Sequence, residues 1–329
     1  MIAGRYAGGI RLAEVVRSGF TESVHRGSVV VLDAAGEPVL TAGDPWGAVF
    51  PRSSNKLMQA TGMLTAGFEP ADSEELALAA ASHHGEPFHT ERVAAMLARA
   101  GLEATALACP PDLPFSEPAR TEVLHSGGGP ERVYMNCSGK HAAMLLTCRA
   151  AGWPTTGYTD PAHPLQQALT AAVEQLSGEQ VAAVGVDGCG APVLAISLTG
   201  LARAFLRGVE AAPGTAPRRV ADAMRTHPEL VSGSAGQDAL LMRAVPGLLA
   251  KGGAEGVAAV AIPGVGAVAL KIDDGGDRAR GPVLAAALRT LGVPKEALAG
   301  LVGDPILGGG RPVGELRAVW PGSGEPRTE

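Results

Sequence analysis

A serine and a lysine lie three residues apart in the stretch Arg-Ser-Ser-Asn-Lys at positions 52–56. Pro51 precedes this stretch and an apolar run with helical spacing follows it, so the sequence predicts a helix that begins near Ser53. On such a helix the β-carbons of Ser53 and Lys56 lie about 5–6 Å apart on one face. A serine hydroxyl becomes a strong nucleophile when a base takes its proton, and a neutral lysine amine can be that base. The spacing indicates a candidate nucleophile and its base, although a solvated helix start has the same spacing.

Composition limits the classes of protein to which the chain can belong. Of its 329 residues, 46% are hydrophobic and 18% are charged, so the chain can bury a large core as one domain or as two closely packed lobes. Its formal net charge of −6 provides neither a basic surface for nucleic acid nor a polybasic patch for a membrane. We therefore expect a small molecule as its partner.

Targeting and redox signals point to the cytoplasm. Residues 1–20 carry several charged side chains where a secretory signal would have an apolar core. The most apolar later stretch, 257–270, is too short to span a bilayer and contains Pro263. The four cysteines form no Cys-x-x-Cys pair, which favours free thiols in a reducing compartment. We expect a cytoplasmic protein that does not bind a membrane.

The predicted elements place a helical region between two strand hairpins. Strand-forming runs with a turn signal between each pair are 28–32 with 38–41 and 256–262 with 266–272. A closing helix is predicted over 281–291, and the middle of the chain is rich in alanine and leucine with helical spacing.

We therefore expect an α/β (α+β) fold in a single domain, 1–329. Residues from about 1 to 60 and from 250 to 329 would form an α/β lobe, and residues from about 61 to 249 a mostly helical lobe. This order of elements is similar to that of serine β-lactamases, penicillin-binding proteins and serine-dependent glutaminases, in which helices flank an antiparallel sheet. Similarity of order alone does not define an activity.

Polar clusters follow several of the predicted helices and strands. The first, Ser-His-His-Gly-Glu at 82–86, follows a predicted helix, and its Ser82 is either the second hydroxyl of a proton relay or a helix cap. The second, Asn-Cys-Ser-Gly-Lys-His at 136–141, is no phosphate loop, because His141 follows the lysine where serine or threonine is required. The third, Asp-Gly-Cys-Gly-Ala-Pro at 187–192, follows a predicted strand, and its glycines permit an irregular backbone that presents polar side chains.

In their order along the chain these motifs resemble those of the asparaginase II family, the rhizobial-type (class 3) L-asparaginases. The resemblance also includes Lys-Gly-Gly-Ala-Glu-Gly at 251–256 and Ala-Leu-Lys-Ile-Asp-Asp-Gly at 269–275, and it runs from about Arg52 to Arg278. It implies a serine hydrolase with a fold of the penicillin-binding-protein type that acts as a homodimer.

The resemblance also implies roles for individual residues. Two serine–lysine pairs would act together, with Ser53 as the nucleophile: Ser53 with Lys56, and Ser82 with Lys271. Zinc would bind to two cysteines and a lysine: Cys137, Lys140 and Cys189. Substrate contacts would come from Arg52, His141 and Asp187. The alternative for the two cysteines is that they are small buried packing residues.

The choice of the second lysine rests on the predicted strands. Lys271 ends an alternating run at 267–270, where an edge strand would project it into a cleft, whereas Lys251 precedes Gly252-Gly253 and is predicted to lie in a loop. The Lys-Gly-Gly sequence faintly resembles the Lys-Thr-Gly triad of penicillin-binding enzymes, so Lys251 remains the alternative.

Three functions are consistent with these residues. The first is an L-asparaginase that hydrolyses L-asparagine to L-aspartate and ammonia. The second is a serine glutaminase or a β-lactam-type acyl enzyme, and the third is a non-catalytic amino-acid- or metal-binding protein. Asparagine and glutamine differ by one methylene, worth only about 1–3 kcal/mol in a pocket, so the sequence does not choose between them.

Overall fold

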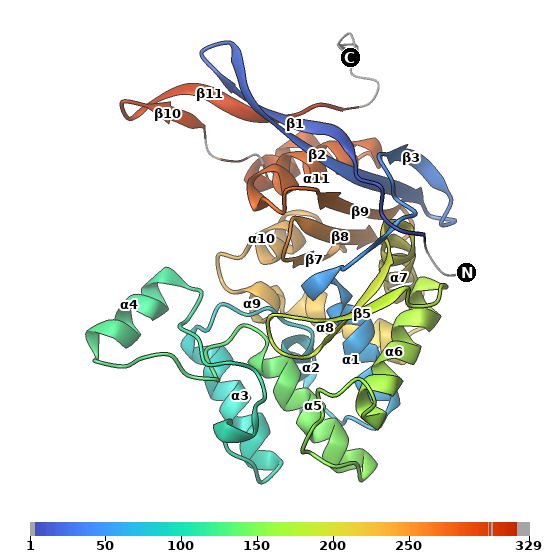
Figure 1. Cartoon of the computed structure of the whole chain (residues 1–329), viewed down its shortest axis with the longest axis vertical. Helices are drawn as coiled ribbons and strands as arrows, with labels where there is room; N and C mark the ends of the chain where they lie inside the picture. The colour runs from blue at the N-terminus through green and yellow to red at the C-terminus, as the bar shows by residue number, and fades with distance from the viewer. Residues whose placement is uncertain (1–3, 302, 304, 321–329) are drawn as a thin grey trace.

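A large antiparallel sheet forms one end of the molecule in the computed structural model, which describes residues 4–301, 303 and 305–320 (Figure 1). In order across this sheet, its strands are β10 (Ile306–Gly308), β11 (Arg311–Ala318), β1 (Ile10–Arg17), β2 (Phe20–Asp33), β9 (Gly266–Ile272), β8 (Val257–Ile262) and β7 (Leu249–Gly253). A further strand, β3 (Pro38–Ala42), pairs with the second half of β2. Strand β7 is thus one edge of the sheet.

Both predicted hairpins are confirmed, as β2–β3 and β8–β9. The side chain of Asp33 accepts hydrogen bonds from the amides of Ala35 and Glu37, which closes the first turn. Strands β8 and β9 are buried at almost every position, and the helices α7 (Leu198–Glu210) and α11 (Arg280–Thr290) both pack against them. The predicted closing helix is therefore confirmed as α11.

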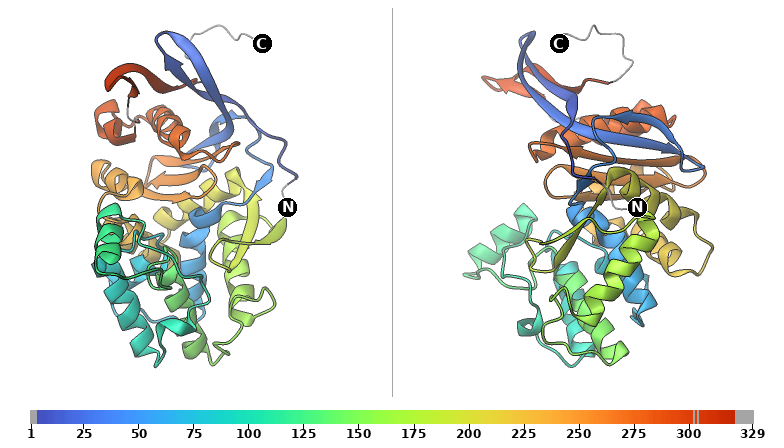
Figure 2. Two further views of the ribbon diagram at one scale, coloured as in Figure 1. Left: turned by 60° about the vertical axis from the view of Figure 1, so that its left-hand side comes forward. Right: turned by 45° about the vertical axis from the view of Figure 1, so that its right-hand side comes forward.

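Helices make up most of the other end of the molecule (Figures 1 and 2). They are α1 (Lys56–Thr65), α2 (Ser73–Ala79), α3 (Pro87–Arg99), α4 (Glu117–His125), α5 (Ser138–Ala151), α6 (Pro164–Ser177), α8 (Ala216–Thr226), α9 (Pro228–Ser232) and α10 (Gln237–Ala244). Short 3₁₀ turns are η1 (Arg52–Asn55), η2 (Ala104–Ala106), η3 (Asp277–Ala279) and η4 (Lys295–Leu301). The mixed α/β fold with an antiparallel sheet agrees with the prediction.

The predicted helical region also contains strands. A smaller sheet has the order β4 (Ala48–Val49), β6 (Pro192–Ser197) and β5 (Ala183–Val186). Strand β5 ends directly before Asp187, so this sheet positions the third polar cluster. Within the described residues, no helix has both the length and the apolar character that crossing a membrane requires.

Helix α1 is the central element of the helical end. Eight of its ten residues are buried, and it packs against α6, α8 and α5. Its first turn lies against the edge strand β7, because η1 contacts both β7 and β8. The start of α1 therefore lies at the junction between the helical end and the edge of the large sheet.

Candidate active site

The serine–lysine stretch forms the predicted helix start. Ser53 lies in the 3₁₀ turn η1 and is partly exposed, whereas Lys56 is the first residue of α1 and is buried. Arg52 has φ +51°, a left-handed conformation that is uncommon outside glycine. Such conformations persist where the surrounding structure enforces them, and they cluster at functional sites. The unusual backbone therefore lies directly before the candidate nucleophile.

The amine of Lys56 connects three segments of the chain. Its Nζ donates to the carbonyl oxygen of Ala81, lies 2.9 Å from Ser82 Oγ and lies 3.0 Å from Cys137 Sγ. The amide of Ser82 is held by the carbonyl of Val231 at 2.9 Å. The structure thus brings the segment at 81–82 to the buried amine of Lys56 in the serine–lysine stretch, and Lys56 donates a hydrogen bond to Ser82.

The strand positions of the two candidate second lysines differ from the prediction. Lys271 lies on β9, which is an interior strand between β2 and β8, and Lys251 lies on the edge strand β7. The expectation of an edge strand at Lys271 and a loop at Lys251 was therefore wrong. Glycines disfavour strands when judged locally, which is why Gly252-Gly253 suggested a loop.

The surroundings of the two lysines also differ. Lys251 is buried, and its pKa is lowered to about 8, because burial and, to a smaller extent, Lys56 together outweigh the opposing effect of Asp238. Lys271 is partly exposed, and its Nζ donates to the carbonyl oxygens of Glu255 and Ile272 at 2.8 and 3.2 Å. Lys251 is thus the lysine that shares its surroundings with Lys56.

The two glycines after Lys251 leave room for groups that pack closely against this strand, and Gly253 faces the nucleophile turn. A β-carbon added at Gly253 would lie 2.4 Å from the carbonyl oxygen of Pro51, and one at Gly252 would lie 2.9 Å from a guanidinium nitrogen of Arg280. Ser54 Oγ donates to the carbonyl oxygen of Lys251 at 2.9 Å. A side chain at position 253 would push the edge strand away from η1, so this close approach requires glycine there, whereas a side chain at position 252 would crowd Arg280 and Asp238.

The predicted metal ligands also lie together. Lys140 Nζ lies 3.3 Å from Cys189 Sγ, and the Cys137 thiol is hydrogen-bonded to Cys189. That hydrogen bond lowers the pKa of Cys189, assisted by the charge of Lys140. Burial alone would lower the pKa of Lys140, but the two sulfurs raise it. Two sulfurs and one amine thus converge in a buried space.

This donor set suits zinc in type, since zinc prefers thiolate ligands, although the lysine would have to lose its proton to bind it. No group of three or more His, Cys, Asp or Glu side chains suited to a metal is found among residues 4–301, 303 and 305–320. The amine of Lys140 is the group beside Cys189 that the sequence prediction assigned as a further donor.

His141 is buried next to this cluster. Its Nδ1 lies 2.7 Å from the hydroxyl of Tyr158, which accepts a hydrogen bond from the amide of Ala108 at 2.8 Å. Burial, followed by the charge of Lys140, lowers the pKa of His141 to about 3, so its ring is neutral. Within the described structure, its Nε2 is buried and has no hydrogen-bond partner. A neutral ring with one unused nitrogen can still bind a polar group of a ligand.

Arg52 and Asp187 form an ion pair beside Ser53. Arg52 Nε donates to Asp187 Oδ1 at 2.7 Å, and the arginine also lies 3.9 Å from the carboxylate of Glu255. Burial would raise the pKa of Asp187, but the charge of Lys140 and the hydrogen bond from Arg52 lower it. Both residues therefore carry their charges in a partly buried position next to the nucleophile turn.

These contacts link most of the predicted site residues into one cluster. Lys56 contacts Cys137, which contacts Cys189, and Cys189 contacts Lys140. Lys140 acts on the charge of Asp187, and Asp187 pairs with Arg52, the residue next to Ser53. Lys271 makes its hydrogen bonds to the backbone oxygens of Glu255 and Ile272. Sequence reasoning did not identify Asp238 or Tyr158, because an isolated acid and an isolated tyrosine carry no spacing signal.

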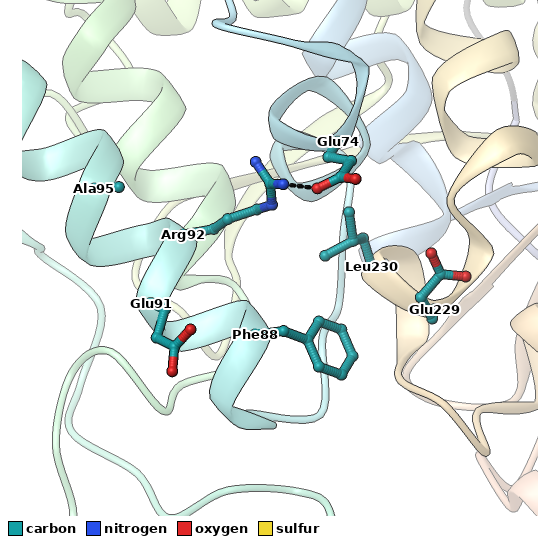
Figure 3. Close-up of a pocket in the computed structure, with 7 residues that line it drawn as sticks. All are labelled: Glu74, Phe88, Glu91, Arg92, Ala95, Glu229 and Leu230. Atoms are coloured by element: carbon teal, nitrogen blue, oxygen red, sulfur yellow. Dashed lines mark ion pairs between the residues drawn. The ribbon is translucent and has the colours of Figure 1, made fainter.

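A separate cavity of about 510 Å³ lies among α2, α3 and α9 (Figure 3). Its walls include Glu74, Phe88 and Glu229, and Arg92 forms an ion pair with Glu74 within it. None of the predicted site residues lines this cavity. It is therefore distinct from the serine–lysine cluster.

The fold and the cluster together define an α/β protein in which partly exposed serines lie beside buried lysines and thiols at the edge of an antiparallel sheet. A family model described as L-asparaginase II matches residues 13–318, so the chain belongs to that family. Membership supports an asparaginase-type amidohydrolase activity.

The other two comparisons provide less information about the function of this protein. A search of curated proteins found no match. A solved structure described as "Crystal Structure Analysis of Mglu in its native form" is similar at 15% sequence identity and a TM-score of 0.44, over 80% of this chain. The chain spans 63% of the length of that protein.

Proposed function

We propose that this protein hydrolyses the side-chain amide of L-asparagine to L-aspartate and ammonia, with Ser53 as the nucleophile. The observation that supports the proposal is the convergence of five separate segments, at 52–56, 81–82, 137–140, 187–189 and 251–253, on the start of α1. Within the L-asparaginase II family this convergence is best explained by a substrate site.

In the proposed reaction Ser53 Oγ attacks the amide carbonyl carbon, and Lys56 in its neutral form takes the serine proton. The C–N bond breaks, and a proton passes through Ser82 to the leaving nitrogen, which departs as ammonia. Water then cleaves the ester on Ser53 by the same proton route in reverse. The amide of Ser53 lies in the first turn of η1, where backbone N–H groups have no partner within the helix, and it is a suitable donor to the oxyanion.

Lys251 takes the place of Lys271 as the second lysine in this proposal. It lies on the edge strand beside η1, and its charge and that of Lys56 influence each other. Below its pKa of about 8 the lysine is positively charged and can stabilise negative charge in the cleft. Lys271 lies beyond Glu255, whose backbone oxygen accepts its hydrogen bond.

A free amino acid carries a carboxylate and an ammonium group, so its binding site needs one positive and one negative side chain. Arg52 is suited to the α-carboxylate and Asp187 to the α-ammonium, and the neutral ring of His141 would contribute a hydrogen bond. A homodimer and a cytoplasmic location complete the proposal.

The ammonium contact leads to a prediction for Asp187→Asn. We expect KM for asparagine to rise about 10- to 100-fold, because a hydrogen bond to a charged group is worth roughly 1.5–3 kcal/mol. Steady-state kinetics of ammonia release measure this effect. Asp222→Asn removes a carboxylate from a remote ion pair with Arg218 and is the matched control. An unchanged KM in the Asp187 variant would remove that residue from the substrate site.

The two cysteines lead to a second prediction. We propose that Cys137, Lys140 and Cys189 hold zinc, which when bound would supply positive charge that orders these loops. Protein purified without added zinc is then expected to contain about one zinc per chain, and Cys189→Ser to contain less than about a tenth of that. Elemental analysis measures the metal. Cys148→Ser alters another buried thiol and should keep its zinc; equal zinc in all three proteins would contradict the proposal.

Ammonia release from asparagine, from glutamine and from β-lactams tests the function itself. We expect turnover with asparagine. Rapid hydrolysis of glutamine or of a β-lactam with little asparagine turnover would favour a glutaminase or an acyl enzyme of the β-lactam type. Asparagine binding without any turnover would favour the non-catalytic alternative.

A further inference from the structure

A buried carboxylate joins the proposed second lysine to the edge strand. Asp238 lies in the first turn of α10, and its Oδ2 accepts a hydrogen bond from the amide of Gly252 at 2.8 Å. The same oxygen lies 3.3 Å from Lys251 Nζ. The lysine side chain is 2% exposed and that of the aspartate 14%, so water screens this pair little.

The other charged or titratable groups that act on Lys251 do not stabilise its charge. Arg280 from α11 lowers the pKa of Lys251, and Lys56 from α1 also lowers it whenever Lys56 carries a proton. His84, from the loop after α2, also interacts with Lys251, and burial lowers the pKa of this histidine, so it is neutral near pH 7. Burial itself opposes the charge on Lys251. Asp238 is an anion that favours the protonated form of Lys251. The carbonyl oxygen of Gly252 also accepts a hydrogen bond from Lys251 Nζ, at 2.9 Å.

Asp238 is also held firmly in place. The charge of Lys251, followed by that of Arg280, lowers the pKa of Asp238 despite its burial, so the carboxylate is ionised at neutral pH. Arg280 donates to the carbonyl oxygen of Gly253 at 3.2 Å and to the side chain of Gln237 at 3.1 Å. Because Gly252 has no β-carbon, the carboxylate can reach both the strand amide and the amine.

We propose that Asp238 is a positioning residue that keeps Lys251 protonated and holds the Lys251–Gly253 edge strand beside the nucleophile turn. The effect on catalysis rests on the proposed function, because it requires Lys251 to act on the substrate. The effect on the charge of Lys251 does not require any activity and can be measured separately.

The direction of the effect follows from the charges. Lys251 loses its proton as the pH rises through about 8, and the charged form is the one that Asp238 stabilises. Asp238→Asn keeps an oxygen for the amide of Gly252 but removes the negative charge. Lys251 should then lose its proton at a lower pH, and any loss of activity on the alkaline side should begin at a lower pH as well.

NMR titration of protein with ¹³C-labelled lysine tests the charge directly. The chain has five lysines, so few Cε signals appear, and Lys251→Met identifies the signal of Lys251. We expect its midpoint to fall by about one pH unit in Asp238→Asn and to stay near the wild-type value in Asp238→Glu. An unfolded variant would shift the midpoint upward, toward about 10.4, and Asp238→Ser then replaces the asparagine variant. Glu75→Gln, which removes another buried carboxylate from an ion pair, should leave the midpoint unchanged.

Equal Lys251 midpoints in wild type and in both charge-removing variants would overturn the inference. The pH profile of kcat for asparagine provides the second measurement, and its alkaline limb should move to lower pH in Asp238→Asn together with the NMR midpoint. A shifted midpoint with an unmoved pH profile would support the role of Asp238 and contradict the proposed role of Lys251 in catalysis.

Discussion

Ser53→Ala is expected to lower kcat for asparagine hydrolysis by about 10⁴-fold or more, because it removes the attacking oxygen. Ser53 is partly exposed at the start of α1, so loss of one oxygen there should leave the fold intact. Ammonia release measured at saturating asparagine, together with the binding of asparagine to the variant, separates lost chemistry from lost binding. We expect binding to persist while turnover ends.

The neighbouring serine provides a control for this result. Ser54 is buried, and its hydroxyl donates to the backbone of Lys251, so its role in the proposal is structural. Ser54→Ala is expected to lower stability modestly, by about 1 kcal/mol, and to retain most of the activity. If Ser53→Ala hydrolysed asparagine at a rate near that of wild type, Ser82 would become the better candidate for the nucleophile.

Much of the fold could be predicted because its signals are local. The hairpins at β2–β3 and β8–β9 follow from alternating runs that surround turn residues, and α11 follows from helical spacing. Strand β1 was not predicted, since its sequence mixes apolar with charged residues. Its Glu14 is buried and paired with Arg317 on β11, a contact between opposite ends of the chain that no local pattern contains.

In the candidate site, too, the local features could be predicted and the long-range contacts could not. The serine–lysine spacing and the order of the motifs pointed to the segments that meet at α1, because both can be read along the chain. The partners of Lys56 could not be predicted in this way, since they come from 81–82 and from Cys137. Gly252 and Gly253 suggested a loop when read locally, but both lie in strand β7, and Gly253 lets this strand lie close to η1.

The second large effect is expected from the edge-strand lysine. Lys251→Met should lower kcat for asparagine by about 10²- to 10³-fold, because it removes the positive charge beside the nucleophile turn. Methionine keeps the length of the side chain, but it leaves the buried carboxylate of Asp238 without the amine that lies 3.3 Å from it. The alkaline limb of the pH profile near 8 should therefore disappear together with the group that titrates there.

Lys271→Met is the matched comparison, because it makes the same substitution on an interior strand of the same sheet. Lys271 is partly exposed and bonded to backbone oxygens, so its loss should change kcat by no more than about threefold. Thermal unfolding of both variants shows whether either effect comes from the fold. The opposite order, with Lys271→Met inactive and Lys251→Met active, would return the second lysine to β9. It would also mean that substrate binds on the Glu255 side of Arg52, so that the edge strand only supports the site.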